Sequence, residues 1–195
     1  MKFMRLIPQS LFAGLVLCLA SGCSTLIPVK PTPLNGGQLL PQHVALVLDQ
    51  EFSNYVHKMV LLGGSDNYPM GVALQDYARN VATSSFQRME VASSEEQAAA
   101  LAADDLILIP KVVKSDNSLS KFIPFVPPKL TMTLVVEWTA KYRATHNTLW
   151  LKTITVTDTD VAHHKARLFQ QLFDDLSQKT YRAIQDASEL RANPH

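Results

Sequence analysis

The chain has 195 residues and a formal net charge of +1, from 18 basic and 17 acidic residues. It has no run of lysine and arginine, so it lacks the clustered positive charge that nucleic-acid binding needs. Its two cysteines, Cys18 and Cys23, both lie at the start of the chain, which leaves no thiol further on for a disulfide, a zinc site or a nucleophile.

Residues 1–22 have the three regions of a secretory signal peptide. Lys2 and Arg5 form a basic start, residues 11–20 are an apolar run, and small residues lead up to Cys23. The apolar run is about half of the ~20 residues that a membrane-spanning helix needs. We therefore expect a signal that is removed, not a permanent transmembrane helix.

The sequence Leu-Ala-Ser-Gly-Cys at residues 19–23 resembles the lipobox of bacterial lipoproteins. The resemblance implies that the chain is cut before Cys23, that this thiol carries a diacylglycerol, and that the new amine is acylated, for example with palmitate. Two or three acyl chains hold a protein on a bilayer essentially permanently. Ser24, in place of an aspartate, implies transfer to the outer membrane, with the body of the protein in the periplasm. The alternative is an ordinary secreted protein cut near Ser21.

Residues 23–42 follow as a segment rich in proline and glycine, which opposes helix formation. We expect the lipidated cysteine to be followed here by an extended tether. The rest of the chain, residues 43–195, has a length that suits one domain with its own core.

The first half of this domain predicts two strands and two helices. Residues 43–48 are wholly apolar, which is typical of a strand covered on both faces. A second apolar run, 55–62, closed by turn residues at 63–67, predicts a strand that pairs with the first as a hairpin or is separated from it by a bulged loop. Apolar residues at helical spacing predict an amphipathic helix from Pro69 to Met89. Ser93 and Glu96 then predict a capping box for a short alanine-rich helix, after a short strand near Val91.

The second half predicts a long antiparallel hairpin and a final helix. Residues 106–113 form a strand in which Pro110 implies an edge position or a bulge. After a predicted loop over 115–129, residues 130–143 alternate apolar and polar side chains, which is the pattern of a strand with one buried face. Residues 149–157 return as its partner, and Asp158 to Asp160 predict the cap of a helix running to about residue 190.

This order of elements predicts an α+β fold, a two-layer sandwich in which two principal helices cover one face of a mainly antiparallel sheet. Together with the lipobox and the segment Leu172-Phe-Asp-Asp-Leu-Ser177, the layout looks like small outer-membrane lipoproteins of the YajG type. It is also similar to LptE-like lipoproteins of lipopolysaccharide assembly and to the subunit domain of CsgG-like lipoproteins. The resemblance implies a non-catalytic periplasmic accessory protein.

No motif in the sequence indicates catalysis, a metal or a cofactor. Asp158, Asp160 and His164 could form a metal site, but helix capping explains the same residues, and adjacent His163 and His164 diverge on a helix. No serine has the glycine flanks of a hydrolase elbow, and Gly63-Gly64 lacks the lysine of a phosphate-binding loop. We therefore expect no enzyme activity; an envelope hydrolase would need scattered histidines and carboxylates to meet in a cleft.

The candidate contact site is the loop over residues 119–128. Four large apolar residues lie between its prolines: Phe122, Ile123, Phe125 and Val126. If exposed, they would form the kind of apolar patch that marks contact with a partner or a membrane. The alternative is that the loop folds back as a lid over the open end of the sheet.

The leading hypothesis is a lipid-anchored accessory protein that binds another envelope protein through this loop and the sheet edge near Pro110. The second hypothesis is a carrier of lipids or other hydrophobic ligands, with a pocket between sheet and helices lined by Trp138, Trp150 and Phe86.

Overall fold

The structure is a computed structural model of the chain and describes residues 29–34, 37–61, 64–101, 105–121 and 123–191. A five-stranded sheet in the order β4-β1-β5-β6-β7 forms one layer. Its strands are β1 (Leu40–Val47), β4 (Phe86–Ala92), β5 (Leu106–Leu119), β6 (Lys129–Tyr142) and β7 (Thr148–Val161). β1 runs parallel to β4 and β5, whereas β5, β6 and β7 form an antiparallel ladder.

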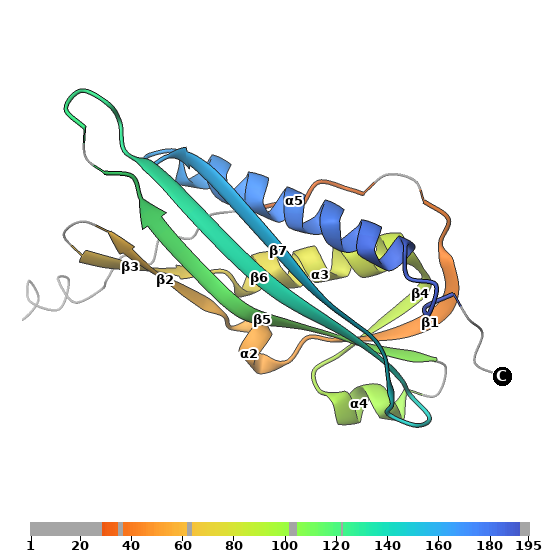
Figure 1. Ribbon diagram of the computed structural model, residues 1–195. Coiled ribbons are helices and arrows are strands. Elements are labelled where there is room, and N and C mark those ends of the chain that lie inside the picture. The colour runs from red at the N-terminus through yellow and green to blue at the C-terminus, as the bar shows by residue number, and fades with distance from the viewer. Residues whose placement is uncertain (1–28, 35–36, 62–63, 102–104, 122, 192–195) are drawn as a thin grey trace, which may run out of the picture.

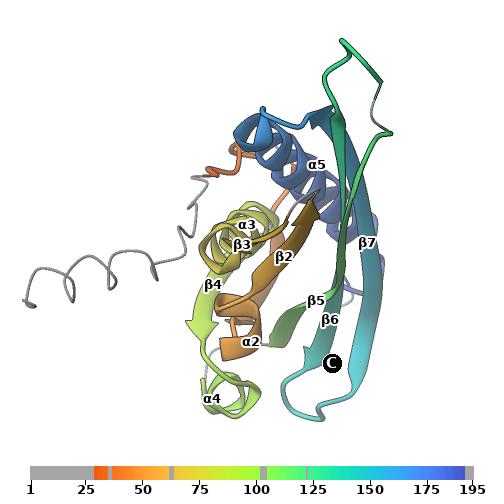
Figure 2. The same ribbon diagram turned by 90° about the vertical axis from the view of Figure 1, so that its left-hand side faces the viewer.

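The helices α3 (Gly71–Ser85) and α5 (Lys165–Gln185) form the second layer on one face of this sheet (Figure 1). Figure 2 shows both helices on the same side of β5, β6 and β7. The short α2 (Gln50–Ser53) follows β1, and α4 (Glu95–Ala100) packs on the start of β5 from the other side. The predicted α+β two-layer sandwich is confirmed.

Both long helices form because their apolar residues recur at three- and four-residue spacing and face the sheet. α3 buries Leu74, Tyr77, Ala78 and Val81, and α5 buries Leu168, Phe169, Leu172, Phe173 and Leu176. Each such large side chain contributes about 1.5 to 3 kcal/mol on burial. Within the described residues, no helix combines the length and the apolar character needed to cross a membrane.

The predicted pairing of the first two apolar runs is wrong. The helix α2 separates them, and β2 (Val56–Leu61) pairs instead with β3 (Gly64–Pro69) in a separate two-stranded sheet. Residues 64–67, predicted as a turn, are therefore part of a strand. β1 obtains its neighbours from β4 and β5, which lie far along the chain, so no local pattern could have shown the pairing.

The end of the first long helix was also predicted wrongly. α3 ends at Ser85, and Phe86 to Ala92 form β4, although Phe86 and Met89 continue the helical spacing. The edge position beside β1 stabilises these residues as a strand. The cap of α4 is Ser94, one residue later than expected: Gln97 N donates to Ser94 Oγ at 3.2 Å, and Ser93 N donates to Gln97 Oε1 at 2.7 Å.

The strands of the hairpins are longer than the sequence indicated. β5 continues through residues 115–119, which remain paired with β6. The loop therefore covers only residues 120–128. Pro110 lies beyond the pairing with β1, which ends at Leu108, and a bulge follows between Val112 and Lys114. β7 includes Asp158 and Asp160, so neither caps α5.

Candidate functional site

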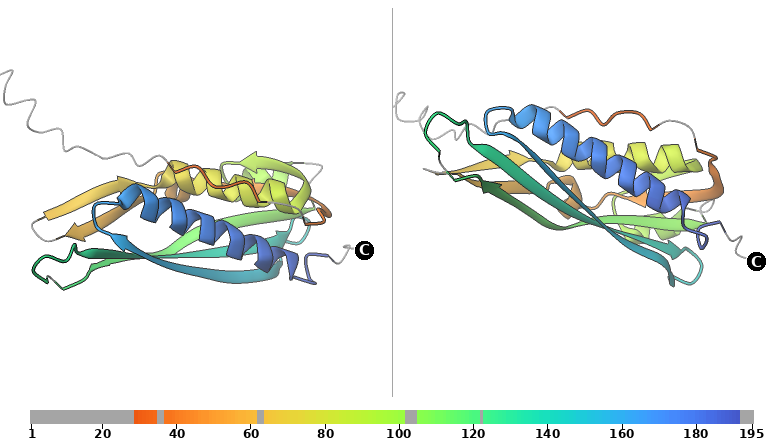
Figure 3. Two further views of the ribbon diagram at one scale, coloured as in Figure 1. Left: turned by 90° about the horizontal axis from the view of Figure 1, so that it is seen from above. Right: turned by 45° about the horizontal axis from the view of Figure 1, so that its top comes forward.

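The loop between β5 and β6 projects beyond the helical layer at one end of the molecule (Figures 1 and 3). Two hydrogen bonds close its base: Ser120 N donates to Lys129 O, and Lys129 N donates to Ser120 Oγ, both at 2.8 Å. At its tip, Val126 N donates to Ile123 O at 3.1 Å. This bond closes a four-residue turn with Pro124 and Phe125 at its centre.

The apolar side chains of this tip face solvent. Phe125 is 104% exposed, and Ile123 and Val126 are 56% and 51% exposed. They do not fold back over the sheet, so the conformation differs from the lid alternative. Phe122, the fourth residue of the predicted contact site, lies outside the described residues. We call Ile123, Phe125 and Val126 the apolar tip.

Phe125 occupies a backbone conformation that favours glycine. Its φ is 66°, and it follows a proline at the centre of the turn, as the third residue of a type II turn does. A side chain in this left-handed region costs roughly 1 to 2 kcal/mol relative to glycine. Because Phe125 packs against nothing that would offset this cost, its presence at the tip has no structural explanation.

The segment from Val29 to Leu34, predicted as part of the free tether, is bound between α3 and α5. Gln170 of α5 exchanges two hydrogen bonds with the backbone of Lys30, at 2.7 and 3.2 Å. Thr32 N donates to Asp174 Oδ1 at 2.9 Å, and Asn80 of α3 donates to Thr32 O at 3.0 Å. Within the described residues, Val29 to Leu34 therefore belong to the packed body, ahead of the expected start at residue 43. The signal peptide and Cys23 lie outside the described residues.

The start of the bound segment lies toward the end of the molecule from which the loop projects. Val29 is buried beside Phe169 and Phe173, in the first turns of α5. Ala162, just before α5, donates to Pro128 O at the base of the loop at 2.8 Å. The two features thus converge on the start of α5, and Figure 3 shows the described start of the chain running along this helix.

The centre of the core is a polar cluster that the sequence did not reveal. Trp138 Nε1 donates to Tyr77 Oη at 2.7 Å, and Tyr77 Oη also bonds Thr180 Oγ1 at 2.7 Å. The two rings meet edge to face with centroids 5.9 Å apart. Burial raises the pKa of Tyr77, so the phenol stays neutral. Trp138 and the buried Phe86 are thus core residues.

Trp150, the third residue proposed to line a ligand pocket, borders an open groove of about 470 Å³ between β7 and α5. The groove also contains Lys152, Lys179 and Arg182 beside Asp186 and Glu189. Charges of both signs line it, which is a poor environment for a hydrophobic ligand. The three proposed lining residues do not form one pocket.

A serine and a histidine meet where β2 contacts β5. Ser115 Oγ lies 2.8 Å from His57 Nδ1 and 2.6 Å from Tyr55 Oη. His57 is almost fully buried, and this burial lowers its pKa, so the imidazole is neutral near pH 7. The contact joins the two sheets. Because the serine hydroxyl takes part in two hydrogen bonds, Ser115 does not have the arrangement of an exposed nucleophile.

Asp160 and His164, two of the three residues considered for a metal site, have other partners. Arg167 donates to both carboxylate oxygens of Asp160 and holds the pKa of that carboxyl well below its usual range. His164 Nδ1 lies 3.0 Å from Arg167 Nη2, and its ring is 4.1 Å from that of His163. Within the ranges that the structure describes, no three histidine, cysteine, aspartate or glutamate side chains come together as metal ligands.

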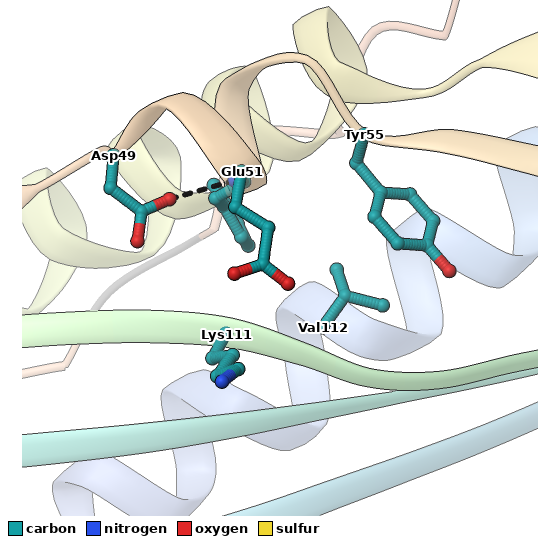
Figure 4. Close-up of a pocket in the computed structure, with 6 residues that line it drawn as sticks. Asp49, Glu51, Tyr55, Lys111 and Val112 are labelled. Carbon is teal, nitrogen blue, oxygen red and sulfur yellow. Dashed lines mark hydrogen bonds between the residues drawn. The ribbon is translucent and has the colours of Figure 1, made fainter.

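A small pocket lies between α2 and β5 (Figure 4). Asp49 caps α2, since Phe52 N donates to its Oδ1 at 2.7 Å, while Glu51 and Lys111 border the opening. The enclosed space of about 10 Å³ is roughly that of one water molecule. It is too small for a substrate or a cofactor.

Comparison with solved structures identifies a shared fold. A protein of Xanthomonas campestris, described by the family model DUF330, matches with a TM-score of 0.54 and 13% identity, over 82% of this chain and 90% of that one. At this identity the likeness shows the fold alone. No family model matches the sequence, and no curated protein matches it.

Two further structures match less closely. A homologue of the neuraminyllactose-binding hemagglutinin of Helicobacter pylori has a TM-score of 0.49 and 5% identity, over 86% of this chain and 94% of that one. A minor lipoprotein of Acinetobacter baumannii has a TM-score of 0.41 and 13% identity, over 75% and 92%. Other matches are also described as bacterial lipoproteins. The specific resemblance to YajG-type and LptE-like lipoproteins stays a prediction.

Proposed function

We propose that this chain is a lipid-anchored accessory protein of the bacterial cell envelope that acts by binding and not by catalysis. The lipobox at Cys23 supports the anchor, and Ser24 supports a place on the periplasmic face of the outer membrane. The observation that carries the proposal is the apolar tip, in which Phe125 is 104% exposed at the end of a projecting hairpin.

A binding role explains the sequence of the tip better than a structural role does. Folding would favour glycine at position 125 and polar residues on either side, because nothing covers them. Apolar side chains held outside the protein in this way lower the free energy only when another component covers them. The tip is thus the contact surface that we assign to this protein, and an envelope component is its partner.

The absence of catalysis is part of the proposal. The His57 ring is buried, the half-buried hydroxyl of Ser115 is shared between His57 and Tyr55, and the carboxylate of Asp160 is bound by Arg167. Neither arrangement leaves a reactive group facing an open cleft. Activity against envelope substrates that depends on Ser115 would overturn this part.

Photo-crosslinking in intact cells tests the contact surface. A photoreactive phenylalanine analogue replaces Phe125, and in a matched control it replaces Leu151, which is 57% exposed on the same sheet. We expect adducts with one envelope component, protein or lipid, at position 125 and not at 151. Equal or absent crosslinking at the two positions would contradict the assignment.

A serine variant separates contact from folding. Phe125→Ser should remove the contact while leaving the melting temperature nearly unchanged, because the ring packs against nothing. A large loss of stability would instead show that the loop closes as a lid.

A further inference from the structure

We propose that the apolar tip inserts into the same bilayer that holds the lipid anchor, so that the protein rests on the membrane at two points. The inference rests on the proposed function, because it needs lipid at Cys23 and contact at the tip. The partner of the apolar tip is then a lipid surface, and the end of the protein that carries the loop faces the membrane.

The length of the chain between the anchor and the docked segment supports this orientation. Six residue steps separate Cys23 from Val29. Fully extended, they span at most about 20 Å, at roughly 3.3 to 3.6 Å per residue. Val29 is buried against the first turns of α5, and Gln170 and Asp174 hold the residues that follow it. The start of α5 therefore lies close to the lipid surface, and the loop projects from this same end.

The chemistry of the loop suits the boundary between lipid headgroups and acyl chains. Three apolar side chains form its tip, and two exposed lysines, Lys121 and Lys129, flank it. Among the residues that the structure describes, neither lysine has an ion-pair partner. Basic residues beside an apolar surface favour membranes that contain anionic lipids.

The backbone of the loop is also suited to leaving water. An unpaired amide hydrogen is costly in an apolar environment. Pro124, Pro127 and Pro128 have no amide hydrogen, and Val126 N is already bonded to Ile123 O. These four residues of the loop therefore present no unpaired amide hydrogen to the bilayer.

Because of the anchor, even a weak interaction of the apolar tip with lipid is sufficient for insertion. Once the lipid on Cys23 is in the bilayer, insertion of the tip is an intramolecular step at a high effective concentration. Two contact points also restrict rotation about the tether.

The test uses the full lipidated protein in vesicles of phosphatidylethanolamine and phosphatidylglycerol. An environment-sensitive dye is attached to a single introduced cysteine, in Val126→Cys or, as the matched control, in Leu151→Cys. Leu151 is ten residues along β7 from Val161, which pairs with Lys129 at the base of the loop. This places the control about 30 Å further away, at ~3.3 Å per residue.

We expect the dye at position 126 to shift its emission to the blue and to be quenched by a lipid-borne quencher. The dye at position 151 should remain accessible to a quencher in the water. Adding Phe125→Gly, which the turn favours, should weaken insertion about tenfold, because the variant lacks one large apolar side chain to bury in the bilayer. Equal exposure to water at positions 126 and 151 in the vesicles would overturn the inference.

A second measurement distinguishes failure of this inference from failure of the proposed function. If the dye at position 126 is exposed in vesicles but protected in native envelope membranes, the tip binds a protein, and only the inference fails. If it is exposed in both, the tip is not a contact surface, and both proposals fail.

Discussion

The core beneath α3 and α5 and the tip of the β5–β6 hairpin use aromatic residues in opposite ways. In the core, Trp138 and Tyr77 are fully buried, and their polar atoms are hydrogen-bonded. At the tip, Phe125 is fully exposed on a strained backbone. The comparison shows that packing accounts for the core aromatic residues, whereas no packing contact accounts for Phe125, to which we assign a binding role.

The two regions are joined by the same strands. β5 begins and β6 ends in the packed part of the sheet, and β6 buries every second residue from Leu130, beside the loop, to Ala140. Beyond the helices the same hairpin supports the loop. The core thus holds the tip in a fixed position, and substitutions in the two regions should have separable effects.

The largest expected effect is that of Trp138→Ala. Removing a fully buried tryptophan leaves a cavity and leaves Tyr77 without its donor, which should cost about 3 to 5 kcal/mol of the free energy of unfolding. Urea denaturation measures this cost, with Leu151→Ala on the exposed face as the control. A loss similar to that of the control would mean that this region is not the centre of the core.

Tyr77→Phe tests the polar part of the core alone. The ring remains, but Trp138 Nε1 and Thr180 Oγ1 lose their shared partner, at a cost of about 1 to 3 kcal/mol. The half-buried Tyr142→Phe serves as the matched control for loss of a hydroxyl, with both variants compared by thermal unfolding. An unchanged melting temperature would show that the cluster contributes no net stability.

His57 should make the stability of the fold depend on pH. Burial lowers the pKa of His57 in the folded state, so below about pH 6.5 the unfolded chain binds this proton more readily than the folded chain. Stability is therefore lost as the pH falls through this value, by at most about 1.4 kcal/mol per pH unit. The loss should be smaller in His57→Gln.

Urea denaturation on both sides of pH 6.5 measures this difference. The other histidines are present in both proteins, so the comparison isolates the contribution of His57. Identical pH slopes in the two proteins would contradict the assignment of a neutral, buried imidazole.

The smallest effect on stability is expected for Phe125→Gly. Glycine relieves the strain at φ 66° and loses no packing, but it also gains freedom in the unfolded chain. The free energy of unfolding should therefore change by between zero and about +1 kcal/mol. Calorimetry against Phe125→Ser measures this change. A clear loss of stability in both variants would show that the tip packs on the protein and would remove the contrast between the two regions.

Local patterns predicted the long elements well. The alternation of Leu130 to Tyr142 and the helical spacing of Leu168 to Leu176 are properties of neighbouring residues, so both elements were recognisable. The errors concern segments whose partners lie far along the chain. Phe86 and Met89 fit a helix by spacing, yet Phe86 to Ala92 form a strand because β1 offers an open edge.

The candidate site was predicted only in part. The apolar residues between prolines identified the loop, but not whether it was covered or exposed. The sequence did not indicate that the segment after Val29 is bound by Asn80, Gln170 and Asp174, since each of these looks like an ordinary polar surface residue. The pairing of Trp138 with Tyr77 also depends on packing between residues 61 positions apart.

The sequence by itself determined the expectation of an anchor at Cys23, the α+β class and the apolar loop, because these depend on composition and on short-range periodicity. The tertiary structure decided which strands pair, that the chain after Val29 is docked, and that Phe125 faces solvent at the same end as this segment. These features depend on the free energy of contacts between distant segments, which no local pattern contains.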